Sequence, residues 1–308
     1  MYDVIIIGGG PAGVAAGIYC ARKNLKVILL TKDLEGQIFD SPKVENYPGF
    51  KEISGINLSA KLKEHLLNFS SNIEIKEGFF VKKIERIEDN NFQIATEDGK
   101  KFISKVIIIA SGASPRKLDV PGAKEFEGKG VSFCETCDGP FLKEKDVVVV
   151  GSGNAGLEAA EELASYTNKV CVLEIKNKLV GDEFLAKRLE KKGNVEIIFN
   201  VELKKIKGEN FVEKIIYFDK KEGQEKQLNV SGIFVKVGQF PNSDFAEDSL
   251  EINERKEIII NPKTLETSEE GIFAAGDVTD ISYKQYIIAA GEGAKAALSA
   301  YNYLKNKK

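Results

Sequence analysis

Two copies of one glycine pattern constrain this sequence more than any other feature. One copy reads "DVIIIGGGPAGVAAG" and the other reads "DVVVVGSGNAGLEAA". Each places G-x-G-x-x-G between an apolar, β-branched run typical of a buried parallel strand and an alanine-rich stretch typical of a helix. Glycines at this spacing allow a tight turn, close approach of the backbone to a pyrophosphate, and close packing of helix on strand. The sequence therefore predicts two βαβ dinucleotide-binding units.

The expected phosphate-binding loops join the first strand of each unit to its helix, because the helix N-terminus there faces the phosphates. A single motif of this kind is weak support, whereas two copies that each sit between a strand and a helix are specific. In the first unit the loop residues are Gly8, Gly10, Pro11, Ala12 and Gly13. In the second unit they are Gly151, Gly153, Asn154, Ala155 and Gly156.

The two units differ at the end of their second strand. The second unit places Glu174 there, where an acid accepts hydrogen bonds from an adenosine ribose 2′-hydroxyl. The first unit places Thr31 at the matching position, so it lacks the usual acid. Asp33 and Glu35 remain alternatives for that role in the first unit.

Late in the chain, "GIFAAGDV" places Gly276 and Asp277 directly after an apolar run. An acid at a strand end can hydrogen-bond a ribityl hydroxyl of a flavin. A helix is predicted over residues 283–304, and its positive N-terminal end would stabilise an anionic reduced flavin. In the segment "VIIIASGASPR", Ser111 and Gly112 predict a tight turn beside the same ligand.

The order of these signals predicts one domain inserted into another. The first βαβ unit opens the chain and Asp277 lies near its end, yet both belong to one nucleotide site. We therefore expect an α/β protein of two Rossmann-like dinucleotide-binding domains, with residues 1–115 and 241–308 forming the first domain and residues 116–240 the inserted one. The Gly- and Pro-containing stretches "RKLDVPGAKEFEGKG" and "VGQFPN" are the expected linkers. Residues 70–105 resemble a short antiparallel excursion.

The segment "VSFCETCDGP" carries two cysteines, Cys134 and Cys137, followed by Asp138. Structural zinc and iron–sulfur clusters need four ligands, and the chain has four cysteines and one histidine in total. Cys20 and Cys171 are isolated and fall in predicted core elements, so we expect no metal site. A C-x-x-C pair lowers the thiol pKa, and Asp138 can exchange the proton that thiol–disulfide exchange requires. The segment therefore predicts a redox dithiol in the inserted domain.

Composition argues against other classes of protein. The net charge of −3 gives no basic footprint for nucleic acid. The sequence contains no apolar run of the ~18 residues needed to span a membrane. The segment "MYDVIIIGGGPAG" lacks the basic region and cleavage site of a signal peptide. We therefore expect a cytoplasmic protein.

In combination and in order, the motifs resemble those of low-molecular-weight thioredoxin reductase. The resemblance covers residues 1–306 and rests on "IIIGGGPAG", "EGQIFDSPKVENYPGF", "IIIASGASPR", "CETCDGP", "VVVVGSGNAG", "GIFVKVGQFPN" and "GIFAAGDV". From Gly151 onward the sequence is also similar to the flavoprotein subunit of alkyl hydroperoxide reductase.

This resemblance implies FAD in the outer domain, a reduced nicotinamide in the inserted one, a homodimer, and a rotation between the domains. It implies that Cys137 faces the flavin, that Cys134 attacks the disulfide of thioredoxin or a similar small dithiol protein, and that Asp138 is the acid. It places further cofactor contacts at Gly36, Gln37, Asn46, the strand start at Val81 and Lys82, Ser111, Gly112, Gly276, Asp277, Lys284, Gln285 and Tyr286.

One departure from the family pattern bears on the electron donor. NADPH-using members carry a His-Arg-Arg cluster directly after the second strand of the inserted unit, whereas this sequence reads "LEIKNKLVGDE". The Glu174 carboxylate would repel a 2′-phosphate, which predicts NADH rather than NADPH.

Other donors, acceptors and functions remain open. Relatives without the basic cluster can take electrons from ferredoxin, a transfer that runs downhill in potential to thioredoxin. A peroxiredoxin system is the alternative acceptor. A flavin monooxygenase or a non-catalytic FAD sensor would not need the C-x-x-C-D segment.

Overall fold

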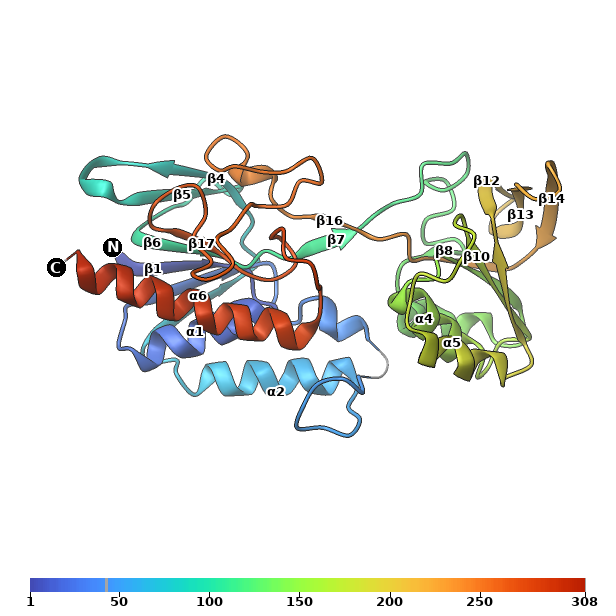
Figure 1. Cartoon of the computed structure of the whole chain (residues 1–308), viewed down its shortest axis with the longest axis horizontal. Helices are drawn as coiled ribbons and strands as arrows, with labels where there is room; N and C mark the ends of the chain where they lie inside the picture. The colour runs from blue at the N-terminus through green and yellow to red at the C-terminus, as the bar shows by residue number, and fades with distance from the viewer. Residues whose placement is uncertain (42–43, 308) are drawn as a thin grey trace. The chain divides into compact units, whose positions relative to one another are not determined.

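The computed structural model describes residues 1–41 and 44–307. The chain divides into two compact units, which Figure 1 shows with their helices and strands labelled. Unit 1 consists of Met1–Ser114 and Phe240–Lys308, and unit 2 consists of Pro115–Gln239. The chain passes between the units twice, through β7 (Ala113–Pro115) and β16 (Gln239–Pro241), which pair as a two-stranded sheet. Together these observations show an α/β chain with one Rossmann-like domain inserted into another.

Unit 1 is built on one large sheet. Its central strands are parallel. In spatial order the strands are β3 (Ile73–Glu77), β2 (Val27–Thr31), β1 (Tyr2–Ile7), β6 (Lys101–Ile109), β5 (Phe92–Thr96) and β4 (Val81–Arg86), and β17 (Ile272–Ala274) also pairs with β6.

The segment at 70–105 only partly matches its prediction. Strands β4 and β5 pair in antiparallel fashion, as expected, and the short 3-10 turn η2 (Glu88–Asn90) joins them. Strand β3, however, pairs with β2 in parallel and belongs to the main sheet. The reason is the preceding helix α2 (Gly55–Leu67), which returns the chain to the same edge of the sheet.

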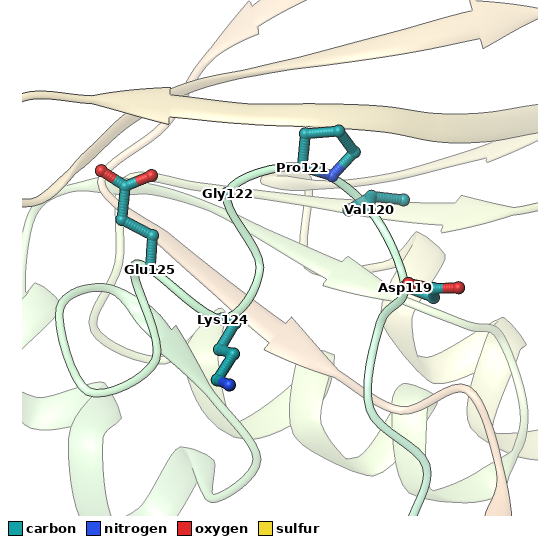
Figure 2. A pocket seen from close by; sticks show the side chains of 6 residues that line it. All are labelled: Asp119, Val120, Pro121, Gly122, Lys124 and Glu125. Carbon is teal, nitrogen blue, oxygen red and sulfur yellow. The ribbon is translucent and has the colours of Figure 1, made fainter.

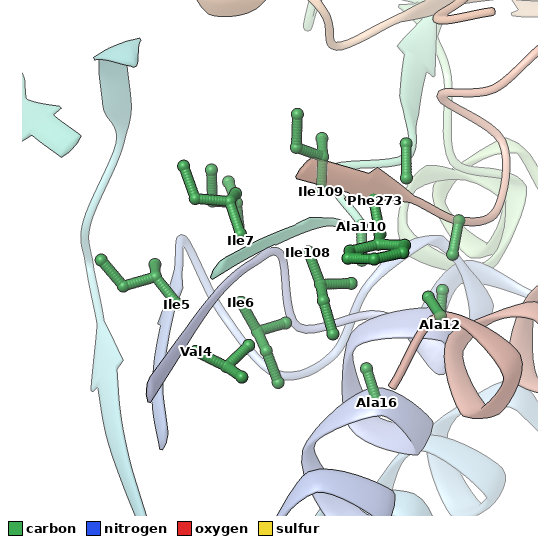
Figure 3. Packing of buried hydrophobic residues seen from close by; sticks show 14 of the residues in the cluster. Val4, Ile5, Ile6, Ile7, Ala12, Ala16, Ile108, Ile109, Ala110 and Phe273 are labelled. Carbon is green, nitrogen blue, oxygen red and sulfur yellow. The ribbon is translucent and has the colours of Figure 1, made fainter. Parts of the chain in front are cut away.

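The core of unit 1 explains its sequence pattern. The apolar runs of β1 and β6 are buried on both faces of the sheet, as expected of central parallel strands. Helix α1 (Pro11–Arg22) presents small residues to this sheet, so that helix and strand approach closely (Figure 3). Helix α6 (Tyr286–Asn306) packs closely on α1. The closeness is seen at Gly293, where an added Cβ atom would lie only 1.9 Å from the Ala12 carbonyl oxygen.

Unit 2 contains a second parallel sheet of Rossmann-like order. Its strands are β11 (Val195–Phe199), β10 (Lys169–Glu174), β9 (Asp146–Val150), β15 (Gly232–Val235) and β8 (Val131–Ser132). The helices are α3 (Glu135–Asp138), α4 (Asn154–Leu163) and α5 (Glu183–Glu190), with the 3-10 turn η3 (Gly139–Leu142) after α3. An antiparallel meander of β12 (Val201–Gly208), β13 (Val212–Asp219) and β14 (Gln224–Asn229) completes the unit.

Two shorter features complete the description of the fold. The 3-10 turns η1 (Gln37–Asp40) and η4 (Asp244–Ala246) belong to unit 1. Within residues 1–41 and 44–307, no helix is both long enough and apolar enough to cross a membrane.

Candidate functional site

The first glycine loop of unit 1 has the close backbone packing that the sequence predicts. Gly8 has a φ of +109°, and a Cβ atom there would lie 2.2 Å from the Ala110 carbonyl oxygen. A Cβ atom at Gly13 would lie 1.9 Å from the Gly8 carbonyl oxygen. At Gly10, by contrast, a Cβ atom would meet no atom of the described chain within 4 Å. The loop therefore packs tightly on its protein side and is open where a pyrophosphate would approach.

At the end of β2, the side chains of Thr31 and Asp33 form hydrogen bonds with nearby backbone atoms. The Thr31 hydroxyl donates to the Asp33 carbonyl oxygen at 2.5 Å, and Thr31 is buried. The Asp33 carboxylate accepts from the backbone nitrogens of Glu35 and Gly36, at 3.1 and 3.0 Å. Of the two acids proposed to replace the missing ribose ligand, Asp33 thus shapes the turn, and Glu35 is exposed beside it.

Predicted cofactor residues from distant parts of the chain meet near η1. The Gln37 side chain donates to the Ala113 carbonyl oxygen at 2.6 Å, directly after the turn at residues 111–112. The Asn46 amide donates to the Gln285 side chain at 3.0 Å. The Tyr286 hydroxyl lies 2.7 Å from the hydroxyl of Ser41. Unit 1 therefore brings Gln37, Asn46, Gln285 and Tyr286 together.

Asn242 fixes the turn at Ser111 and Gly112. Its side-chain nitrogen donates to the Ser111 carbonyl oxygen at 2.9 Å, and its backbone nitrogen donates to the Gly112 carbonyl oxygen at 2.9 Å. The Ser111 hydroxyl donates in return to the Asn242 carbonyl oxygen at 2.7 Å. Sequence reasoning missed this role, although Asn242 ends the segment "VGQFPN" that it singled out.

A second carboxylate, Glu292 of α6, lies behind the Gly276–Asp277 turn. Its Oε2 accepts from the Gly276 backbone nitrogen at 2.7 Å, and the residue is 6% exposed. Burial raises the pKa of both the Asp277 and Glu292 carboxyls above their ordinary values. The Lys284 ammonium lies 3.3 Å from Glu257 and donates to the carbonyl oxygens of Thr279 and Asp277. Lys284, which the family resemblance indicates, therefore lies beside this turn. Sequence reasoning did not predict Glu292.

These features fit the flavin nucleotide that the sequence predicts. Gly112 has a φ of +65°, and a Cβ atom there would meet only the Gln37 side-chain nitrogen, at 3.9 Å, among the described residues. The Glu292 Oε1 atom is buried and has no hydrogen-bond partner in the described part of the chain. An open glycine turn and an unsatisfied buried oxygen are both expected where a polar ligand completes the site.

One expected contact stands apart from this cluster. Val81 begins β4 and packs against the core of unit 1, and Lys82 beside it is exposed. The hydrogen bonds that join the cluster near η1 involve neither of these two residues.

The glycine loop of unit 2 repeats the geometry of the first. Gly151 has a φ of +105°, and a Cβ atom at Gly156 would lie 2.0 Å from the Gly151 carbonyl oxygen. Asn154 begins α4, and its side chain accepts from the Asp182 backbone nitrogen at 2.8 Å. The two loops are therefore built on the same close contacts.

Glu174 lies at the end of β10, beside this loop, and is 5% exposed. Its Oε2 accepts from the Ser152 backbone nitrogen at 3.0 Å and from the Ser152 hydroxyl at 2.7 Å. Its Oε1 accepts from the Lys176 backbone nitrogen at 2.9 Å. Sequence reasoning missed Ser152, which ties the carboxylate to the glycine loop.

The dithiol segment forms a short helical turn between β8 and η3. Cys134 and Cys137 are joined in a disulfide. The Ser132 hydroxyl accepts from the Cys134 backbone nitrogen at 3.0 Å, and the Cys137 backbone nitrogen donates to the Cys134 sulfur at 3.2 Å. Cys137 and Asp138 are exposed, whereas Cys134 is half-buried. The turn thus presents a bonded sulfur pair with a carboxylate beside it.

The remaining cysteines have the structural role that the sequence predicts. Cys20 is completely buried and Cys171 is 2% exposed. Burial raises the pKa of each thiol to about 12, so neither is a thiolate near neutral pH. Across the described residues, no group of three or more His, Cys, Asp and Glu side chains could hold a metal ion.

Unit 2 also contains a pocket (Figure 2). A single stretch of chain lines it, consisting of Asp119, Val120, Pro121, Gly122, Lys124 and Glu125. The stretch contributes no cysteine and no residue of the glycine loop, so this pocket is not the candidate site.

Comparisons with known proteins bear on the whole chain. A family model described as pyridine nucleotide-disulphide oxidoreductase matches residues 2–293. The chain is 41% identical to NADH dehydrogenase of Bacillus subtilis (strain 168), over 98% of this chain and 58% of that protein. It is 43% identical to a subunit of the alkyl hydroperoxide reductase of Staphylococcus aureus (strain MRSA252), over 98% of this chain and 59% of that protein. The chain therefore spans a little under three fifths of the length of these relatives.

Solved structures match over nearly their full length. The thioredoxin reductase of Lactococcus lactis (FR conformation) is 36% identical with a TM-score of 0.95, covering 99% of this chain and 100% of that one. A ferredoxin-flavin thioredoxin reductase from Clostridium acetobutylicum is 32% identical with a TM-score of 0.53, covering 99% of this chain and 98% of that one.

Proposed function

The chain belongs to the pyridine nucleotide-disulphide oxidoreductase family, and from this premise we propose that it is an FAD-dependent disulfide reductase acting on thioredoxin or a similar small dithiol protein. The observation that carries the proposal is the Cys134–Cys137 disulfide, held in a turn with exposed Asp138 and within the same unit as a dinucleotide-binding loop. The likeness to solved thioredoxin reductases over the whole chain supports the same activity.

The family implies FAD and a nicotinamide cofactor. In our proposal the glycine loop at residues 8–13, the cluster around Gln37 and the Asp277 turn of unit 1 hold FAD. The loop at residues 151–156 and Glu174 of unit 2 hold the nicotinamide nucleotide. When bound, the flavin supplies two-electron chemistry between the nicotinamide and the Cys134–Cys137 disulfide.

The protein's own residues account for the exchange with the acceptor. In the reduced dithiol, the Cys134 thiolate attacks one sulfur of the acceptor disulfide, forming a mixed disulfide and releasing the other acceptor sulfur as a thiolate. The Cys137 thiolate then attacks Cys134 and re-forms the intramolecular disulfide, which releases the second acceptor sulfur. Asp138 exchanges the proton of the Cys137 thiol. The acceptor gains two electrons and two protons, and the pair Cys134–Cys137 loses two electrons.

We propose NADH as the preferred nucleotide. The support is Glu174, whose buried carboxylate stands at the position that a 2′-phosphate would approach. The name of the Bacillus subtilis relative, NADH dehydrogenase, is consistent with this preference.

Two alternatives have a specific observation behind them. The likeness to a ferredoxin-flavin thioredoxin reductase favours ferredoxin as the donor. The likeness to the alkyl hydroperoxide reductase of Staphylococcus aureus favours a peroxiredoxin system as the acceptor. The intact glycine loop of unit 2 and the ordered Glu174 give more weight to a nucleotide donor.

An assay of disulfide reduction with a chromogenic disulfide separates these possibilities. The purified, flavin-loaded protein is given NADH, NADPH or reduced ferredoxin, with and without thioredoxin or a peroxiredoxin-linked dithiol protein. We expect rapid turnover with NADH that depends on thioredoxin. Reduction with ferredoxin alone would replace the donor, and turnover that requires the peroxiredoxin partner would replace the acceptor.

Three further expectations belong to this proposal. We propose that unit 1 and unit 2 act as the flavin and nicotinamide domains, respectively. A homodimer is expected from the resemblance, and the mass measured by light scattering tests it. A cytoplasmic location is expected because disulfides there are usually transient and catalytic, and fractionation of cells tests it.

A further inference from the structure

The two residues between the active cysteines carry the side chains that anchor the dithiol turn. Glu135 is 3% exposed, and its Oε2 lies 2.6 Å from the ammonium of Lys236, whose side chain is 13% exposed. The same ammonium donates to the Phe133 carbonyl oxygen at 3.0 Å. That carbonyl belongs to the peptide bond that leads into Cys134. Lys236 therefore contacts the residue before Cys134 and the residue after it, and it forms a buried ion pair with the second of them.

Lys236 also packs against the glycine loop of unit 2. Its backbone nitrogen donates to the Val150 carbonyl oxygen at 2.8 Å. A Cβ atom at Gly151 would lie 2.2 Å from the Lys236 carbonyl oxygen, and one at Gly156 would lie 3.6 Å from the Lys236 Cβ atom. The backbone of this residue thus packs on the glycine loop while its side chain reaches the dithiol turn.

The opposite side of the turn rests on α4 and the residues after it. The Thr136 hydroxyl donates to Glu162 at 3.1 Å. A Cβ atom at Gly139 would lie 2.1 Å from the Tyr166 hydroxyl, which is buried and has no hydrogen-bond partner among the residues described. Burial raises the pKa of the Glu162 carboxyl and of the Tyr166 phenol, and the charge of Glu135 adds to both shifts.

We propose that Glu135 and Lys236 are positioning residues that hold the dithiol turn against the nucleotide loop and set the redox equilibrium of the Cys134–Cys137 pair. This inference rests on the proposed function, because it requires that the pair cycles between disulfide and dithiol. Reduction places up to one negative charge on a sulfur of the same short turn that contains Glu135. Because Glu135 and Lys236 are themselves buried, water screens their charges little. Either charge alone would therefore act on the sulfur more than the two opposite charges act together.

The two single substitutions are therefore expected to act in opposite directions. In Glu135→Gln the Lys236 ammonium keeps its place without a counter-charge, so it stabilises the thiolate and favours reduction. In Lys236→Met the Glu135 carboxylate is left uncompensated and disfavours the thiolate. Glu162 and Tyr166 on the α4 side, Asp138 in the turn and Lys117, which lies 5.9 Å from the centre of the Phe133 ring, are unchanged in both variants.

The experiment equilibrates the full-length, flavin-loaded protein with mixtures of reduced and oxidised dithiothreitol at about pH 8, where a thiolate is populated. Free thiols are trapped with iodoacetamide, and the peptide containing both cysteines is quantified by mass spectrometry. The readout is the equilibrium constant for reduction of the Cys134–Cys137 disulfide, which does not depend on turnover. Cys20 and Cys171 do not interfere, because they lie on other peptides and are buried.

We expect the constant to fall in the order Glu135→Gln, wild type, Lys236→Met, with at least about tenfold between the two variants. The double variant should lie between them. Two variants that shift the constant in the same direction, or that differ by less than tenfold, would show that the pair is merely structural and overturn the proposal. If Lys236→Met does not fold, the double variant must still fall at least about threefold below Glu135→Gln.

An exposed ion pair of the same unit gives the matched control. Lys169 and Glu196 lie 2.7 Å apart with side chains that are 47% and 52% exposed, so Lys169→Met and Glu196→Gln should leave the constant within about twofold of wild type. A wild-type disulfide that cannot be reduced reversibly would refute the proposed function itself. Reversible wild-type behaviour without the opposite shifts would refute only the positioning role.

Discussion

The Glu174 carboxylate accepts two hydrogen bonds from Ser152, one from the backbone nitrogen at 3.0 Å and one from the hydroxyl at 2.7 Å. Both bonds go to Oε2, and Oε1 accepts one bond, from the Lys176 backbone nitrogen. A carboxylate oxygen can accept more than one hydrogen bond, so Oε1 keeps capacity for a ribose hydroxyl. The acid that we propose to distinguish nucleotides is thus held in place by a residue of the glycine loop.

The first prediction concerns nucleotide preference. We expect kcat/KM for NADH to exceed that for NADPH by at least about tenfold. Repulsion between the 2′-phosphate and the buried carboxylate should weaken the binding free energy of NADPH by more than about 1.4 kcal/mol. Glu174→Gln keeps an oxygen for Ser152 and removes the charge, so it should narrow the ratio mainly by improving NADPH. Steady-state kinetics with both nucleotides measure this, and Glu196→Gln on the neighbouring strand β11 is the control. An advantage for NADPH in the wild type would contradict the assignment.

A matched pair of glycine substitutions tests the division of cofactors between the units. A Cβ atom would lie 1.9 Å from a carbonyl oxygen at Gly13 and 2.0 Å at Gly156. We expect Gly13→Ala to be purified without the yellow flavin spectrum. Gly156→Ala should keep the flavin and lose at least about tenfold in kcat/KM for NADH, because misplacement of the loop by about 1 Å is costly. Gly291→Ala, at an exposed position of α6 where a Cβ atom meets no described atom within 4 Å, is the control. Loss of flavin from Gly156→Ala would reverse the assignment.

The buried Glu292 predicts a dependence of stability on pH. Burial raises the pKa of this carboxyl above its ordinary value of 4.5, although the Gly276 N–H acts in the opposite direction. The folded state therefore binds more protons than the unfolded state in the window above that value, so the contribution of Glu292 to stability falls as the pH rises.

We expect the unfolding free energy of Glu292→Gln to rise relative to that of the wild type as the pH is raised from about 5 to about 7.5. Thermal unfolding of both proteins at saturating FAD measures this difference. Glu64→Gln, at an exposed position of α2, is the matched control for the loss of one carboxylate. A falling difference would mean that the hydrogen bond from Gly276 outweighs burial.

The cysteine variants test the division of labour in the dithiol. We expect Cys134→Ser to leave the rate of flavin reduction by NADH unchanged and to lower thioredoxin reduction by at least about a thousandfold, since serine cannot replace the attacking thiolate. Stopped-flow absorbance follows the first reaction and a coupled assay follows the second. Cys171→Ala removes a buried thiol outside the dithiol and should keep both activities. Loss of both reactions in Cys134→Ser would contradict the proposed roles.

The features that sequence reasoning predicted are those encoded by adjacent residues. The glycine motifs, the apolar strands around them and the C-x-x-C-D segment each lie within a short stretch, and their spacing follows from the geometry of a βαβ unit or a helical turn. The interruption of the first domain could also be predicted, because Asp277 had to return to the site of Gly8. The cluster of Gln37, Asn46, Gln285 and Tyr286 came from the family resemblance, and the structure brings these residues together.

The residues that were missed depend on contacts between distant segments. Asn242 fixes the turn at Ser111 across 131 positions of the sequence. Glu292 is one acid within an ordinary helical pattern, and only the packing of α6 buries it beside Gly276. Strand β3, "IEIKE", alternates apolar and polar residues, and its own sequence does not show that it pairs in parallel with β2.

The pairing of β7 with β16 has a consequence for how the protein can be divided. Adjacent strands lie about 4.8 Å apart, so the ends of unit 1 at Ser114 and Phe240 are close enough for a short turn to join them. Each hydrophobic cluster draws its described residues from one unit alone. Unit 1 therefore has the topology of a module interrupted at a hairpin by unit 2. A chain with residues 115–239 replaced by a short turn would keep every described residue of the proposed flavin site.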